Sequence, residues 1–183
     1  FLPSPGDGEL VEMIRERGWE SFCEAPEPIP MSIVREFYAN ARADQNGYSV
    51  VRGLTVDYTL EAIRRLIGGT EMESTQDDWV RKSKCLMDLD EIIEGLCVLG
   101  TDWKTNPSTN EKLSFPASAM NRYGRAWNLF ICANIMPSGH PHDVPVARAI
   151  LLYGIVSGEY VDIAYVIHQN IVKFLSTSTR LSL

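Results

Sequence analysis

The chain has 183 residues, of which 45% are hydrophobic and 22% are charged, and this fits one ordinary soluble domain or a pair of small lobes. The composition excludes a collagen-like, low-complexity or wholly disordered chain. The formal net charge of −7 excludes a chain that binds nucleic acid or anionic lipid over its whole surface.

No stretch offers the roughly 18 uninterrupted apolar residues that a transmembrane helix needs, and residues 144–156, the best candidate, include Arg148. The N-terminus lacks the basic start and apolar core of a signal peptide, and the missing initiator Met indicates a piece of a longer protein. The cysteines lack the spacing of a secreted disulfide framework and predict reduced core thiols. They are Cys23, Cys85, Cys97 and Cys132. We expect an intracellular protein of the nucleus or cytoplasm, without membrane contact.

The N-terminal third predicts two helices and a hairpin. Apolar residues at helical spacing predict a helix over residues 9–23 that breaks at Gly18. Prolines within residues 26–30 predict an extended connector, and a second helix ends at residues 44–47. Alternating apolar and polar residues around an Arg-Gly turn then predict a β-hairpin near residues 48–58.

Helices dominate the rest of the prediction. Thr59 is predicted to cap a helix that stops at Gly68-Gly69, and two more helices are predicted around residues 79–87 and 89–99. Residues 100–114 are polar and predict a loop that leads to a helical turn at Phe115-Pro116. The last three predicted helices cover residues 125–136, residues 143–157 with Asp143 as N-cap and Pro145 in the first turn, and the segment after Gly158.

These patterns predict a mainly α fold, a single helical domain of about seven or eight helices with one small β-hairpin. The domain is expected to span residues 9–175, between a flexible N-terminal segment of residues 1–8 and a frayed C-terminal tail of residues 176–183. The chain shows neither internal repeats nor a βαβ rhythm, which argues against Rossmann-type and P-loop folds.

No pattern of side chains predicts catalysis, and we expect no enzyme, no cofactor, no metal site and no catalytic residues. The stretch His140-Pro141-His142-Asp143 could chelate a metal weakly, but an exposed loop is the favoured interpretation. Acidic residues gather on one helical stretch, where a solvated face is favoured over metal-dependent phosphoryl transfer. They are Asp88, Asp90, Glu91 and Glu94.

Aromatic side chains are the more informative feature, because they can serve either a core or an interface. A histidine on the apolar stripe of the last helix can likewise belong to the core or to an interface. The candidate interaction residues are Trp19, Tyr38, Trp79, Trp127 and His168.

An ordered series of short motifs resembles the "putative plant transposon protein" domain of retrotransposon-derived open reading frames in plant genomes. The motifs are Arg17–Cys23, Val34–Asn40, Arg52–Val56, Glu61–Ile63, Ala126-Trp127 with Phe130-Ile131, and Asp143-Val144 with Arg148–Ile155. The resemblance covers residues 17–171. It implies no established activity and carries no catalytic residues.

Three functions follow as hypotheses. The first is a non-catalytic structural or protein-interaction domain of a plant retrotransposon-derived protein, with Gag-like self-association and with nucleic acid bound only through other segments of a longer protein. The second is a host-domesticated, monomeric protein-binding module. The third, a metal-dependent nuclease or integrase-like enzyme, is opposed by the placement of the acidic residues on one helix.

Overall fold

The structure, a computed structural model, describes residues 8–24, 28–41, 47–67, 88–138 and 140–181. The chain forms two compact units. Unit 1 comprises residues 1–71 together with 163–183, and unit 2 comprises residues 72–162.

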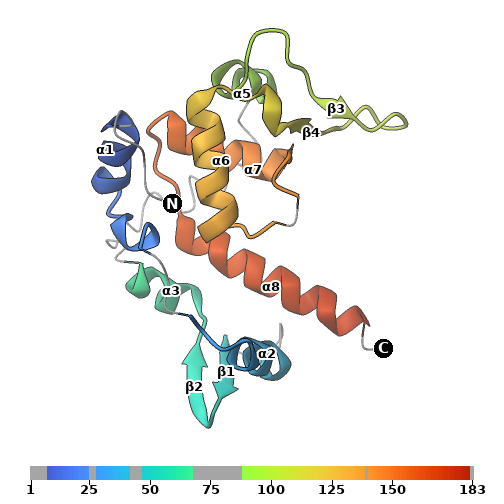
Figure 1. Cartoon of the computed structure of the whole chain (residues 1–183). Helices are drawn as coiled ribbons and strands as arrows, with labels where there is room; N and C mark the ends of the chain where they lie inside the picture. Colours follow the sequence, from blue (N-terminus) through green and yellow to red (C-terminus); the bar gives the residue numbers. More distant parts are fainter. Residues whose placement is uncertain (1–7, 25–27, 42–46, 68–87, 139, 182–183) are drawn as a thin grey trace. The chain divides into compact units, whose positions relative to one another are not determined.

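Unit 1 combines helices with one hairpin (Figure 1). Its elements are α1 (Gly8–Glu16), the 3-10 helix η1 (Glu20–Phe22), α2 (Met31–Asn40), β1 (Tyr48–Val51), β2 (Leu54–Asp57), α3 (Leu60–Leu66) and α8 (Ile163–Leu181). The predicted break at Gly18 is confirmed, because this residue has a φ of +65° between α1 and η1. α8 extends to Leu181, into the segment for which the sequence predicts a frayed tail.

The predicted hairpin and helix cap are confirmed. β1 and β2 pair antiparallel, with Val51 opposite Leu54. Arg52 and Gly53 form the two-residue turn with φ values of 52° and 78°, the left-handed conformations that a type I′ turn requires. Thr59 caps α3, since its side-chain oxygen accepts a hydrogen bond from the Ala62 N–H at 3.3 Å.

The core beside the hairpin joins the two ends of unit 1. Ala41, Tyr58 and Leu175 are buried together, so α8 packs against residues that follow α2 and β2. The Phe37 and Tyr58 rings meet edge to face with their centroids 5.5 Å apart. Such pairs stabilise a core by about 0.5–1.5 kcal/mol beyond the burial of their area.

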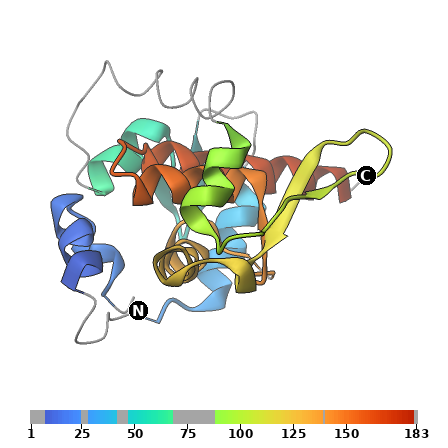
Figure 2. The same ribbon diagram turned by 90° about the horizontal axis from the view of Figure 1, so that it is seen from above.

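Unit 2 packs helices against a three-stranded antiparallel sheet with the order β3-β4-β5. Its elements are α5 (Leu89–Leu96), β3 (Lys104–Thr105), β4 (Lys112–Pro116), the 3-10 helix η2 (Ala117–Ala119), α6 (Arg122–Asn134), β5 (Asp143–Pro145) and α7 (Val146–Val156). Figure 2 shows the β3–β4 hairpin projecting beyond the helices of this unit.

Large apolar side chains close the interior of unit 2. Trp127 and Phe130 of α6 and Phe115 of β4 are fully or almost fully buried. The Trp103 ring packs edge to face on Phe115 at 5.1 Å, and its Nε1–H donates to the Leu89 carbonyl at 2.9 Å. The one polar atom of this indole is therefore satisfied within the core.

The prediction of a single, mainly α domain with one hairpin is wrong. The described residues form seven α-helices and two small antiparallel sheets, a mixed α/β architecture. The segment predicted as a polar loop contains β3 and β4. Asp143 does not cap a helix but begins β5, in which the buried Val144 pairs with Phe115, and Pro145 takes the N-cap position of α7.

Several predictions fall outside the described residues: the stop at Gly68-Gly69, the helix around residues 79–87, and the state of Cys85. Within the described part of the chain, Cys23, Cys97 and Cys132 are free thiols. None of the helices seen there combines the length and apolar character needed to cross a bilayer.

Candidate interaction surface

Of the predicted interaction residues that the structure describes, two are buried and two are half-buried. Trp19 is buried in unit 1 and Trp127 in unit 2. Tyr38 is half-buried and its ring lies 4.7 Å from that of Phe174. Trp79 lies outside the described residues. The interaction role of all these residues stays a prediction.

His168 is half-buried on α8. Its Nδ1 atom is buried and has no hydrogen-bond partner among the residues that the structure describes. Buried imidazole nitrogens usually find a partner or a water molecule. This feature is compatible with both roles considered for His168, in a core or in an interface.

An exposed apolar surface lies instead on the β1–β2 hairpin. We call it the hairpin surface, and it consists of Tyr48, Val50, Leu54 and Val56, whose exposed fractions are 47%, 48%, 71% and 38%. Two faces of the hairpin contribute to it. Leu54 and Val56 lie opposite Val51 and Ser49, while Tyr48 and Val50 point to the other side.

Helix α2 covers one strand of the hairpin and leaves the other open. α2 lies beside β1, and β2 is on the side away from it (Figure 1). The Ser49 hydroxyl donates to the Phe37 carbonyl at 2.8 Å, and Ser49 and Val51 are buried. Leu54 and Val56 lie on the same face of the hairpin as Ser49 and Val51, but on the strand that α2 does not cover, so their side chains stay exposed.

The outer edge of β1 is also occupied by α2. The Asn40 side-chain amide donates to the Val50 carbonyl at 2.6 Å. At the turn, the Arg52 backbone N–H donates to the Glu36 carboxylate at 2.8 Å, and the Arg52 guanidinium pairs with the same carboxylate at 3.1 Å. These contacts close this edge to any further strand.

The outer edge of β2 is open. In a two-residue hairpin the pairs Val51–Leu54 and Ser49–Val56 exchange the ladder hydrogen bonds, so the N–H and C=O of Thr55 point away from β1. The Tyr58 N–H donating to the Gly47 carbonyl at 2.7 Å continues the same alternation. No described residue pairs with the Thr55 backbone.

This edge lacks several of the features by which proteins usually protect edge strands, although β2 has only four residues and ends at a charged side chain. Lysine, proline and bulges discourage the addition of another strand, and the sequence Leu54-Thr55-Val56 in regular register has none of them. Asp57 ends the strand. Hydrogen bonds from the Thr59 side chain and backbone lower the pKa of the Asp57 carboxyl, so it is charged at neutral pH.

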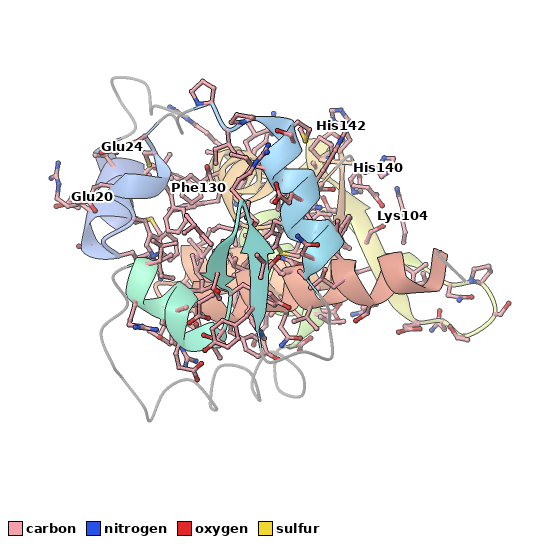
Figure 3. All side chains as sticks on the ribbon, turned by 90° about the horizontal axis from the view of Figure 1, so that it is seen from below. Glu20, Glu24, Lys104, Phe130, His140 and His142 are labelled. Carbon is pink, nitrogen blue, oxygen red and sulfur yellow. The ribbon has the colours of Figure 1, made fainter. Side chains whose placement is uncertain are left out.

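A polar cluster occupies unit 2. The Lys104 ammonium lies 2.8 Å from the Asp143 carboxylate, and His140 and His142 lie on the same side of the unit (Figure 3). The hydrogen bond from Lys104 is the largest cause that lowers the pKa of Asp143. Both histidines are exposed, as expected for a loop. Among the residues described, no group of three or more His, Cys, Asp or Glu side chains could hold a metal ion.

The acidic stretch of α5 has structural partners. The Asp88 carboxylate caps the helix by accepting the Asp90 N–H at 2.9 Å. The Asp90 carboxylate pairs with the Lys112 ammonium of β4. All four acidic side chains are exposed, as expected for the predicted solvated face.

The hairpin surface was not among the sequence predictions. The alternation identified the strands, but periodicity does not say which side chains a helix covers. A weak sign was present in the sequence, since both faces of the hairpin carry apolar residues where a one-sided core needs only one such face.

A comparison with protein families matches residues 15–182 to a family described as "Putative plant retrotransposon-related domain". Comparisons with curated proteins and with solved structures find no match.

Proposed function

Since the chain belongs to the plant retrotransposon-related domain family, we propose that it is a non-catalytic structural domain whose copies associate with one another in a Gag-like manner. The hairpin surface is the observation that carries this proposal. Its four apolar side chains are between 38% and 71% exposed, two on each face of the hairpin, and exposed apolar side chains gathered on one element often mark an interaction site.

The expected partners follow from this role. A second copy of the chain, or another protein, contacts the hairpin surface, and the domain requires no cofactor. Nucleic acid is bound by other segments of a longer protein, since a net charge of −7 opposes phosphate binding over the whole domain. The protein acts in the nucleus or cytoplasm.

A monomeric, host-domesticated binding module is the second candidate. The open edge of β2 favours this second candidate, because such an edge can accept a strand from a different protein. The two candidates differ in one measurable property, the dependence of molar mass on concentration.

Light scattering over a wide concentration range, at two salt concentrations, tests the proposal. We expect the mass to rise from that of one chain to a defined oligomer. Leu54→Lys should weaken the association, whereas Leu66→Lys should not, because Leu66 is 85% exposed but lies on α3, away from the hairpin surface. A constant monomer mass would overturn the proposal and favour the binding module.

A separate assay addresses the enzyme hypothesis. Incubation with DNA and Mg²⁺ should leave the DNA intact. Cleavage that disappears in Asp90→Ala, a variant of an exposed side chain, would contradict a non-catalytic role and favour the integrase-like alternative.

A further inference from the structure

We propose that two copies of the chain pair edge to edge through β2 and form a continuous four-stranded antiparallel sheet, β1–β2–β2′–β1′. This inference rests on the proposed self-association and specifies which atoms mediate it. The acceptor and donor groups are the backbone C=O and N–H of Thr55 in each copy.

The first argument is that β2 offers the open edge of this hairpin. β1 is closed by Asn40, whose amide occupies the Val50 carbonyl. On β2 the Thr55 backbone has no described partner, and an exposed unpaired N–H and C=O on an extended strand is a template for another strand.

The second argument is symmetry. An antiparallel pair of identical strands has a two-fold axis, so the contact uses the same surface on both copies and closes at a dimer. With the axis at Thr55, the two Thr55 residues exchange both hydrogen bonds. Leu54 of each copy then lies opposite Val56 of the other, so that exposed apolar side chains meet across the new pair.

The third argument is charge. The same register places Asp57 opposite Gly53 of the other copy and beside its Arg52, so no like charges face each other. Arg52 is already paired with Glu36 of its own copy, and Asp57 with Arg65 and Thr59. The charges therefore allow this register through the absence of like-charge contacts and do not add a new ion pair.

The area sets the expected strength. Leu54 and Val56 together expose about 200 Å² per copy, well below the roughly 800 Å² per partner of a standard stable interface. Edge pairing alone therefore gives a weak, transient dimer that forms only at high chain concentration. The Tyr48 and Val50 side of the sheet stays exposed in such a dimer.

The test uses the whole chain and two variants of one residue. Thr55→Pro removes the outward N–H, and it leaves the hairpin ladder intact because this N–H does not bond to β1. Thr55→Val keeps the N–H and the size of the side chain. We expect wild type and Thr55→Val to dimerise in light scattering, and Thr55→Pro to stay monomeric with an unchanged circular dichroism spectrum.

The outcomes separate the two proposals. A wild-type chain that stays monomeric at all concentrations overturns both. A wild type and a Thr55→Pro variant that dimerise alike overturn edge pairing and leave self-association standing. Should Thr55→Pro unfold, hydrogen exchange of the wild-type Thr55 amide decides: exchange that slows at least tenfold with rising concentration supports the pairing, and exchange independent of concentration overturns it.

Discussion

Replacing Asn121 by alanine should lower the free energy of unfolding by about 2 kcal/mol, because this one side chain closes two helix ends. Its Oδ1 accepts the Gly124 N–H at 2.8 Å and caps α6, and its Nδ2 donates to the Gly95 carbonyl in the last turn of α5 at 2.9 Å. Loss of an N-cap costs about 1 kcal/mol, and loss of the second hydrogen bond costs about 0.5–1.5 kcal/mol.

Asn121→Ser is the matched control, since a serine hydroxyl caps a helix as well as asparagine but lacks the amide that reaches Gly95. Urea denaturation, followed by tryptophan fluorescence, measures both variants. With a slope of about 2 kcal/mol per molar urea, we expect the alanine midpoint to fall by about 1 M and the serine midpoint by about half of that. An alanine variant as stable as wild type, or a serine variant as unstable as alanine, would refute the two-ended role of Asn121.

Three further predictions concern the turn, the ion pair and the thiols. Gly53 has a φ of +78° and open space around it, so Gly53→Ala should lower the free energy of unfolding by about 1–2 kcal/mol, because the left-handed conformation strains any residue with a Cβ. Gly8 has no positive φ, and Gly8→Ala should leave the free energy of unfolding unchanged. Equal losses for the two variants in urea denaturation would contradict this explanation. The hydrogen bond from Lys104 is the chief cause that lowers the pKa of Asp143 in the fold. The stabilisation is therefore present above the ordinary carboxyl pKa of about 4 and is lost as pH falls through the folded value. In urea denaturation, Asp143→Asn should reduce stability modestly at pH 7, and its difference from wild type should shrink as the pH falls below about 4; a difference that does not change with pH would argue against the charge. Burial raises the pKa of the Cys97 thiol to about 11, so alkylation at pH 8, followed by mass spectrometry, should modify it only after unfolding; equal rates in buffer and in urea would contradict its burial.

Local chemistry explains which parts of the fold the sequence predicted. The Arg52-Gly53 turn and the Thr59 cap each depend on residues within a few positions of one another, and turn and cap preferences act at that range. The predicted start of the helix at residue 125 came late, because the cap at Asn121 precedes the apolar periodicity on which the prediction relied.

The second sheet depends on distant residues and was not predictable in the same way. β3 has two residues and β5 has three, too few for an alternating pattern. The pairing of Phe115 with Val144 joins positions far apart in the chain. Asp143 followed two residues later by Pro145 is typical of a helix start, so the sequence predicted a helix there. The structure forms a strand instead, because Val144 is buried in a pair with Phe115 of β4.

The candidate interaction surface was missed for a related reason. The exposure of Leu54 and Val56 is set by the position of α2, which covers β1 and ends short of β2. Tertiary packing of this kind leaves no trace in the periodicity of either strand.

The division of the chain has a consequence for its synthesis. Unit 1 is discontinuous, with its α8 encoded after the whole of unit 2. During translation every residue of unit 2 therefore emerges from the ribosome before Ile171 and Leu175, which complete the core around Tyr58. Since domains can fold during translation, unit 2 can fold first. The core beside the hairpin can form only after α8 has been synthesised.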